Sequence, residues 1–178
     1  MNIILLGTGD TGGAYVLRLV VNQNLNVQFG RFQNGRVMDV PAGVYVYVGS
    51  AMGSDQTLGR RVVRHATRSG NKKPHGIRNK LVDVFGIEVL PKGKKKLHWH
   101  IDFLLDRSEV NLTHVMMVRS AKRLEEVFAE QLMTDVTTSK LAKGLGATDT
   151  RGHTHLLHVP EKIDWWSNLA EQLGKIIQ

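Results

Sequence analysis

Two runs of strand-forming residues with short turn-rich segments between them constrain this fold most strongly. Residues 15–21 are rich in valine, leucine and tyrosine, and residues 44–48 alternate valine with tyrosine. Residues 24–29 alternate apolar and polar side chains, as a half-buried strand does. Turn signals separate these runs, at Asn34-Gly35 and at Pro41-Ala42-Gly43. Such connections are too short for parallel crossovers, so the pattern predicts an antiparallel meander.

The remaining chain mixes helical and strand patterns. Helical periodicity predicts helices at about residues 57–69, at Ala121–Met133 and, as a terminal amphipathic helix, at about 164–177. Residues 110–118 have the composition of a further strand. Residues 98–106 are apolar enough to be buried, but their pattern does not distinguish a helix from a strand. The apolar stripe expected on the second helix consists of Leu124, Val127, Phe128 and Leu132.

The chain is strongly basic, with a formal net charge of +8 and a pI near 9.9. Such a charge favours polyanionic partners through counterion release, without separating DNA from RNA. No apolar run approaches the ~18 residues of a membrane span, and the N-terminus lacks the basic segment of a signal peptide. The sequence contains no cysteine. We therefore expect a single cytoplasmic domain over residues 1–178, with a nucleic-acid partner and no membrane contact.

A basic, turn-rich segment at about residues 70–96 stands out in this domain. Its lysines gather at residues 72–73 and 92–96, and Lys80–Leu90 between them is a short apolar stretch of undetermined type. The run Lys92–Lys96 is often a solvated, mobile surface, and together with Lys72, Lys73, Arg78 and Lys80 it suits non-specific phosphate contacts equally well. Together with two arginines of the preceding helix, the candidate nucleic-acid-binding residues are Arg60, Arg64, Lys72, Lys73, Lys94, Lys95 and Lys96.

Residues 7–12 match the glycine pattern G-x-G-x-x-G of dinucleotide-binding loops. That interpretation requires a helix directly after the loop, with its N-terminus at the pyrophosphate. Residues 14–21 have a strand pattern instead, and Asp39 lies too far along the chain for the usual ribose contact. We therefore favour a flexible turn that leads into a strand.

Two histidine-rich segments raise the possibility of a metal site. His98, His100 and Asp102 share a spacing that some metallohydrolases use, provided that they lie on a strand. The alternative is that one histidine packs beside Trp99 while Asp102 holds a ring nitrogen or a neighbouring arginine. The second segment has the spacing of a weak zinc pattern, formed by Asp149, His153, His155 and His158.

One set of residues matches the needs of phosphodiester hydrolysis. Arg61 would neutralise developing charge, because guanidinium stays protonated and grips phosphate. Glu125 would hold Mg²⁺, which retains much of its water shell. Tyr15 or Tyr47 would act as the base while the other orients the water, and His65 would relay or share the proton. Which tyrosine is the base stays open.

The chain resembles the GIY-YIG nuclease superfamily, and in particular a branch of small GIY-YIG-like proteins found alone or fused to endonuclease III. The resemblance covers roughly residues 12–160. It implies an α+β fold, GIY-YIG-like, in which a small central antiparallel or mixed β-sheet of three strands is flanked by helices. The stretches that carry it are residues 13–17, 41–51, 61–65, 97–102 and 144–149.

This resemblance implies a function and a role for each matching residue. Tyr15 and Tyr47 would be the signature tyrosines, Arg61 the catalytic arginine, and His65 the residue one turn later. Glu125 would bind Mg²⁺ or Mn²⁺, with Glu126 as the fallback. The substrate would be DNA, in repair or defence, and a DNA repair enzyme is a possible partner. The structural signature positions are Gly49, His98, His100 and Asp102.

The chain departs from the superfamily pattern in ways that leave a second function open. The two halves of the signature lie about 30 residues apart, wider than in the nucleases of the superfamily, and the basic segment at about 70–96 has the character of an insertion. We therefore expect a metal-dependent endonuclease. The alternatives are a non-catalytic nucleic-acid-binding module on the same fold and a metallohydrolase of small molecules that uses His98, His100 and Asp102.

Overall fold

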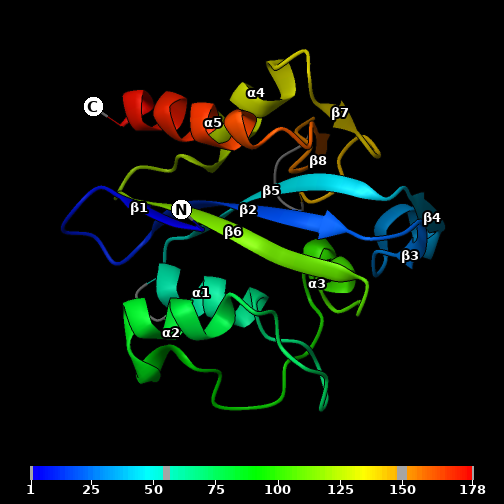
Figure 1. The fold of residues 1–178 in the computed structure, drawn as a ribbon, viewed down its shortest axis with the longest axis horizontal. Coiled ribbons are helices and arrows are strands. Elements are labelled where there is room, and N and C mark those ends of the chain that lie inside the picture. Colours follow the sequence, from blue (N-terminus) through cyan, green and yellow to red (C-terminus); the bar gives the residue numbers. More distant parts are fainter. Residues whose placement is uncertain (1, 54–56, 148–151, 178) are drawn as a thin grey trace.

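A six-stranded mixed sheet lies between two layers of helices in the computed structural model, which describes residues 2–53, 57–147 and 152–177 (Figure 1). The strand order is β1-β6-β2-β5-β8-β7. The expected α+β class with a central mixed sheet is confirmed. The strands are β1 (Ile3–Leu6), β2 (Gly13–Val21), β5 (Gly43–Ala51), β6 (Val110–Arg119), β7 (Ser139–Lys140) and β8 (Leu156–Val159).

The three long strands form the centre of the sheet. β2 pairs antiparallel with β5 on one side and with β6 on the other, so both of its edges are occupied. β1 therefore takes the free edge of β6, to which it runs parallel. The parallel pair β1–β6 makes the sheet mixed, one of the two arrangements expected. The expectation of three strands was also wrong, because β1, β8 and β7 extend the sheet at its edges.

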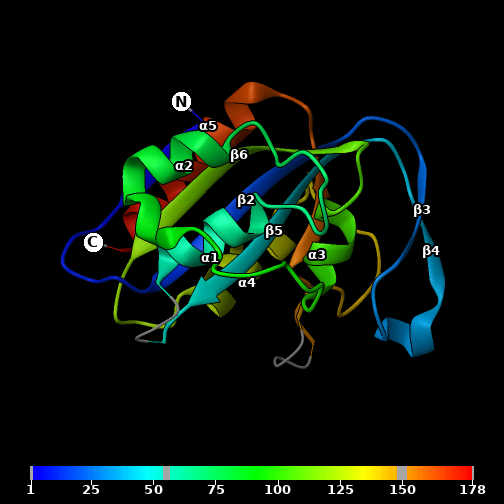
Figure 2. The ribbon, with the colours of Figure 1, turned by 90° about the horizontal axis from the view of Figure 1, so that it is seen from below.

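The two strands β3 (Leu25–Gln28) and β4 (Val37–Val40) pair with each other and form a separate hairpin. A 3₁₀ turn at Phe32–Gly35 closes it, which confirms the turn expected at Asn34-Gly35. The hairpin connects β2 to β5 and projects beyond the end of the main sheet (Figure 2). The N-terminal segment is thus a meander that leaves the sheet and returns to it.

Alternation along the strands divides the core into two layers. Tyr15 and Leu17 of β2 pack on the side of α1, α2 and α3, whereas Ala14 and Val16 pack on the side of α4 and α5. Figure 1 shows these two groups of helices on opposite faces of the sheet. The helices are α1 (Leu58–His65), α2 (Arg78–Phe85), α3 (His100–Leu105), α4 (Glu125–Thr134) and α5 (Ile163–Ile176). In the described part of the chain, none of them is long and apolar enough to cross a bilayer.

The helices follow most of the expected positions. The Thr57 side chain caps α1 by accepting the backbone N–H of Arg60. α1 ends earlier than expected, at His65, and the chain then turns at Gly70, whose φ is 63°. Residues 98–106, whose pattern suited either a helix or a strand, contain the helix α3. The expected terminal helix is confirmed as α5. Val127 was wrongly placed in the buried stripe of α4, because its side chain is 43% exposed.

The basic segment at about 70–96 is built into the core. It contains α2 and a 3₁₀ turn at Ile87–Val89, and it buries Ile77, Leu81 and Val89 against the α1 side of the sheet. The apolar stretch Lys80–Leu90 therefore packs the basic segment against the core, through Leu81 and Val89. In the run Lys92–Lys96, Lys92, Lys94 and Lys96 are exposed, whereas Lys95 is buried.

We expect α2 to contribute directly to stability. Leu81→Ala should lower the free energy of unfolding by about 2–5 kcal/mol, because its fully buried side chain leaves a cavity. Val84→Ala, on the same helix but 49% exposed, should change it by less than about 0.5 kcal/mol. Urea denaturation of both variants measures the difference, and equal effects would contradict the packing described.

His75 makes stability dependent on pH. Its Nδ1 accepts the backbone N–H of Leu112 at 3.1 Å, and its Nε2 donates to the Leu105 carbonyl at 2.9 Å. Burial, followed by the charge of Arg68, lowers the pKa of His75 from 6.5 to about 3. The unfolded chain therefore takes up this proton first as the solution is acidified.

Stability contributed by His75 is thus complete above pH 6.5 and is lost as the pH falls toward about 3. We expect a slope approaching ~1.4 kcal/mol per pH unit from this one group between those values. His75→Gln, which does not titrate, should show a shallower slope than the parent chain. Denaturant titrations at several pH values check this, and an unchanged slope would contradict it.

Candidate active site

The tyrosine of β2 and the histidine of α1 meet in the interior. The hydroxyl of Tyr15 lies 2.8 Å from Nε2 of His65, and both side chains are buried. The Tyr47 ring of β5 lies beside both, with its centroid 6.4 Å from that of Tyr15 and 6.1 Å from that of His65. These three predicted site residues therefore come together, although they belong to three different elements.

Gly49 leaves room for this contact. It is the cross-strand partner of Tyr15, and a Cβ added there would lie 2.4 Å from the tyrosine hydroxyl oxygen. Any larger residue would push the phenol away from His65. This gives a physical reason for glycine at a position that the resemblance marked as a signature.

The other ring nitrogen of His65 faces a carboxylate. Nδ1 lies 3.4 Å from Oδ1 of Asp102, which is close enough for electrostatic attraction but too long for a hydrogen bond. Burial lowers the pKa of His65 to about 4, although Asp102 acts in the opposite direction. The imidazole is therefore neutral at pH 7. With its proton on Nδ1 toward Asp102, Nε2 is left to accept the Tyr15 hydroxyl.

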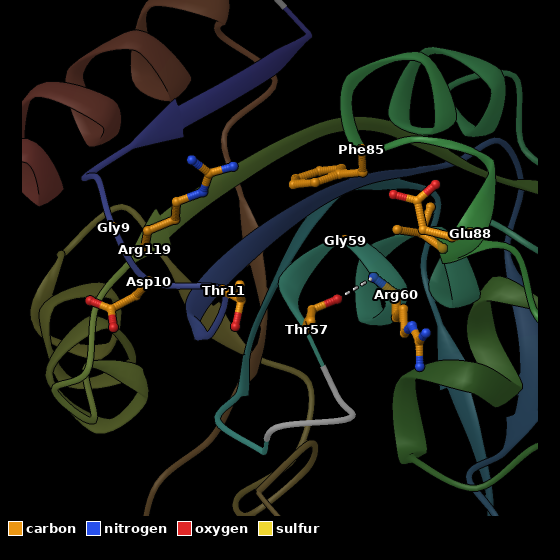
Figure 3. Close-up of a pocket in the computed structure, with 10 residues that line it drawn as sticks. Gly9, Asp10, Thr11, Thr57, Gly59, Arg60, Phe85, Glu88 and Arg119 are labelled. Carbon is orange, nitrogen blue, oxygen red and sulfur yellow. Dashed lines mark hydrogen bonds between the residues drawn. The ribbon is translucent and has the colours of Figure 1, made fainter.

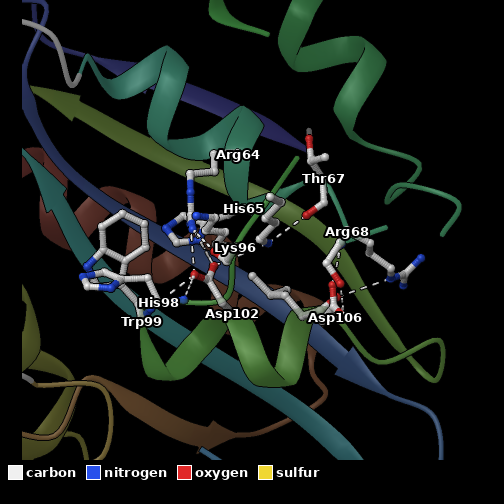
Figure 4. A network of polar contacts seen from close by, with 12 residues as sticks. Arg64, His65, Thr67, Arg68, Lys96, His98, Trp99, Asp102 and Asp106 are labelled. Carbon is white, nitrogen blue, oxygen red and sulfur yellow. Dashed lines mark hydrogen bonds and ion pairs between the residues drawn. The ribbon is translucent and has the colours of Figure 1, made fainter. Parts of the chain in front are cut away.

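Asp102 is the centre of a wider polar network (Figure 4). Arg64 donates to both of its oxygens at 3.0 Å, and Oδ2 accepts the backbone N–H groups of His98 at 3.0 Å and Trp99 at 3.2 Å. Burial by itself raises the pKa of Asp102, but His65 and the neighbouring cations outweigh it and lower the pKa. The expectation that Asp102 holds a neighbouring arginine is confirmed by Arg64, whereas the ring nitrogen of His65 lies near Asp102 without a hydrogen bond.

Lys95 belongs to this network and not to the surface. Its Nζ lies 3.4 Å from Asp102 and donates to the Thr67 carbonyl at 2.7 Å, and its side chain is fully buried. Its predicted role as a nucleic-acid contact was therefore wrong. The sequence places it in a run of exposed lysines, and only the position of a buried carboxylate turns this one inward.

Trp99 packs against two of the three arginines of α1. The guanidinium carbons of Arg61 and Arg64 lie 4.0 Å and 4.3 Å from the centroid of its ring. Cation–π contacts of this kind hold arginine side chains without neutralising them. Beside them runs an open groove of about 600 Å³. The basic and aromatic side chains at this groove are those of Arg61, Arg64, Lys94, Lys96, His98 and Trp99.

The other candidate basic residues lie outside this groove lining. Lys72 pairs with Asp106 while its side chain stays 54% exposed, and Lys73 is exposed. Arg60 lines the cavity at the start of α1 and, together with Arg64, a smaller pocket beside Pro91. The predicted set is thus divided among several parts of the surface.

Glu125, the first residue of α4, approaches the cluster from the opposite helical layer. The Ser50 hydroxyl donates to Oε2, and Nδ1 of His155 lies 3.2 Å from Oε1. Burial raises the pKa of Glu125, but the contacts with His155 and Ser50 and the charge of Arg61 outweigh it and lower the pKa. Its charge also acts on Tyr15, so Glu125 shares the electrostatic environment of the cluster. Glu126 is exposed, which leaves Glu125 as the better candidate.

The donor set at Glu125 fits one kind of metal site. The described residues include no group of three His, Cys, Asp or Glu side chains able to hold a metal ion. A single ionised carboxylate is nevertheless an ordinary protein ligand for Mg²⁺, which keeps water and substrate phosphate as its other ligands. Glu125 would have to exchange a contact with Ser50 or His155 for the ion.

The alternative metal site at His98, His100 and Asp102 was wrong for the described residues. These residues open α3 and do not lie on a strand, so His100 and Asp102 point in different directions. Nδ1 of His100 accepts the backbone N–H of Gly146 at 3.1 Å. Asp102 is engaged by the network described above.

The weak zinc pattern does not form a site in the described part of the chain either. His155 pairs with Glu125, and the ring of His158 packs edge-on against Tyr45, 5.1 Å between centroids. His153 lies 6.4 Å from His155, measured between ring centroids. Asp149 lies outside the described residues.

The glycine-rich loop at residues 7–12 leads into strand β2, as favoured above. It borders a cavity of about 420 Å³ at the start of α1. Figure 3 shows Phe85 and Arg119 on opposite sides of this cavity, with Thr57 and Arg60 below them. The helix that a dinucleotide site requires after the loop is absent here, because β2 occupies residues 13–21.

A family model described as a domain of unknown function, DUF123, matches residues 14–177. The chain belongs to this family. Searches of curated proteins and of solved structures found no significant match. The match to DUF123 spans β2 through α5, so it includes the tyrosines, α1, the Asp102 network and Glu125.

Three contributing residues were missed or undervalued by the sequence reasoning. Ser50 contacts Glu125, and its place directly after the signature Gly49 was the only feature of the sequence that pointed to it. His155 was considered only for zinc. Trp99 was expected to pack beside a histidine, which it does at 5.7 Å from His65, but its stacking on Arg61 required the folded positions of α1 and α3.

Gly49 provides a direct test of this geometry. Gly49→Ala should destabilise the chain by about 1–3 kcal/mol, because its Cβ overlaps the Tyr15 hydroxyl within the packed core. Gly76→Ala is the matched control, since a Cβ added there meets no described atom within 4 Å. Thermal unfolding of both variants measures the difference, and a Gly49→Ala protein as stable as the control would refute the close contact.

Proposed function

We propose that this DUF123 protein is a metal-dependent endonuclease that hydrolyses phosphodiester bonds in DNA and acts in the cytoplasm. The observation that carries the proposal is the contact of Tyr15 with His65, backed by Asp102 and set beside Arg61. The resemblance to GIY-YIG nucleases assigns roles to the same tyrosines, arginine and glutamate. The net charge of +8 is consistent with a polyanionic substrate.

Proton transfer is the first requirement of the reaction. Burial raises the pKa of Tyr15 well above its ordinary value, and Tyr47, Glu125 and Asp102 add to the effect while Arg61 opposes it. Ionised Tyr15 is therefore scarce at neutral pH, and a mechanism that begins from it as the base is unfavourable. Instead, the Tyr15 oxygen accepts a proton from the attacking water as its own proton passes to Nε2 of His65. Asp102 stabilises the imidazolium that forms, as the carboxylate does in a Ser-His-Asp triad.

Charge neutralisation is the second requirement. Arg61 stays protonated and is held by Trp99, so it can grip a phosphate without losing its position. A Mg²⁺ or Mn²⁺ ion held by Glu125 would stabilise charge on the phosphate and on the leaving oxygen. Tyr47 lies next to Tyr15 and would orient the attacking water.

Binding of the flanking strand is assigned to the open groove beside Arg61. Arg64, Lys94 and Lys96 line it, and such contacts with phosphates position a strand without reading its sequence. Repair or defence is the cellular context that the resemblance implies, with a DNA repair enzyme as a possible partner.

A second candidate function is nucleic-acid binding without turnover. The observation that favours it is the state of Glu125, whose two oxygens are already engaged by Ser50 and His155. If these contacts are not exchanged for an ion, the cluster would bind phosphate without cutting it.

The two candidates are separated by a cleavage assay with single-stranded, double-stranded and branched DNA, in Mg²⁺ or Mn²⁺. We expect metal-dependent cutting that falls by about 10²–10⁴-fold in Arg61→Ala and in Glu125→Gln, because each removes charge stabilisation from the transition state. Arg107→Ala and Glu130→Gln are the matched surface controls and should cut normally.

Several outcomes would contradict the proposal. Cutting retained in Arg61→Ala or Glu125→Gln would refute the role of that residue. A salt-sensitive mobility shift without any metal-dependent product would establish the binding module in place of the nuclease.

A further inference from the structure

The tip of the β3–β4 hairpin presents a set of polar side chains for which the fold has no evident use. Arg31, Gln33, Asn34 and Arg36 are all exposed. Within the described part of the chain, none of these four side chains makes a hydrogen bond or an ion pair. Residues 31–36 contain two arginines and no acidic residue, so the tip is locally cationic.

Two of these four residues have an unusual backbone conformation. Gln33 and Asn34 have φ values of 46° and 59°, in the left-handed region that glycine adopts most easily. Glycine at either position would satisfy the turn with less strain. Asn34 suits the left-handed turn by itself, whereas Gln33 does not, so the exposed Gln33 amide is a reason to look for an external contact.

The tip is held firmly beside the candidate active site. Phe29 is fully buried, and the ring of Phe32 packs against His100 at 5.1 Å between centroids. His100 in turn accepts the backbone N–H of Gly146, and a Cβ at Gly146 would lie 3.2 Å from the Tyr47 ring. Figure 2 shows the hairpin at the right edge of the molecule, next to α3, whereas β5 ends at the lower left.

We propose that this tip enters the major groove of B-form DNA and contacts base edges, so that double-stranded DNA is the substrate of the adjoining site. The inference rests on the proposed function and specifies its substrate. The major groove, about 12 Å wide, admits a two-stranded β-ribbon. Arginine pairs with guanine there, and asparagine or glutamine pairs with adenine.

The same geometry argues against duplex RNA as the ligand. The major groove of A-form RNA is deep and too narrow for side chains to reach the bases. Single strands present no groove at all. A ribbon with four free polar side chains therefore matches B-form DNA best among the nucleic acids.

The test measures binding in the absence of divalent metal, so that it does not depend on cleavage. Arg31→Ala/Arg36→Ala should weaken binding to a DNA duplex by about 10–100-fold and lower the slope of log K against log salt by about 2. Lys162→Ala/Lys175→Ala removes the same charge from the opposite helical layer and should weaken binding by less than about threefold.

A second variant separates contact from folding. Gln33→Gly/Asn34→Gly removes both amides while relieving the left-handed backbone, so its Tm should equal or exceed that of the parent. Its affinity for duplex DNA should nevertheless fall by about 10-fold or more, with little change for single strands.

Three outcomes would overturn the inference. These are unchanged duplex affinity in both tip variants, an equal loss on single-stranded DNA or duplex RNA, and an equal loss in the lysine control. A chain that binds duplex DNA through the tip but never cuts it would refute the nuclease proposal and leave the tip assignment standing. A chain that cuts DNA but binds it equally well without the tip side chains would support the nuclease proposal and refute the tip assignment.

Discussion

Asp102 is a fully buried carboxylate, and three segments of the chain converge to neutralise it. α1 supplies Arg64 and His65, the basic segment supplies Lys95, and the start of α3 supplies two backbone N–H groups. Removing one partner of a buried ionic group commonly costs about 3–5 kcal/mol, because the remaining charge stays uncompensated. The positions of α1, α3 and the basic segment are therefore coupled, and so is the orientation of His65 toward Tyr15.

This coupling explains why the basic segment is part of the domain and more than an insertion. It buries apolar side chains of α2 against the sheet and contributes Lys95 to the ionic network. The neighbouring Lys94 and Lys96 line the open groove. In one short run of lysines, Lys95 is thus part of the buried ionic network, while its neighbours present charge at the surface.

The sheet brings together groups from both helical layers. Side chains that alternate along β2 and β5 place Tyr15 and Tyr47 on the α1 side, where His65 and Arg61 meet them. Glu125 comes from α4 on the opposite side and approaches through Ser50 on β5. Tyr15 and Arg61 still interact with it electrostatically, so the candidate site extends across the sheet.

The local features follow from the amino-acid order alone: the long strands, the helix at Arg61 and His65, the hairpin turn and the terminal helix. Strand composition, four-residue helical spacing and turn residues depend on near neighbours in the chain, so these features are predictable from it. The parallel pairing of β1, the inward turn of Lys95 and the contact of Glu125 with His155 appear only in the folded chain. Each of these depends on a partner distant in the sequence, whose position is set by packing across the sheet.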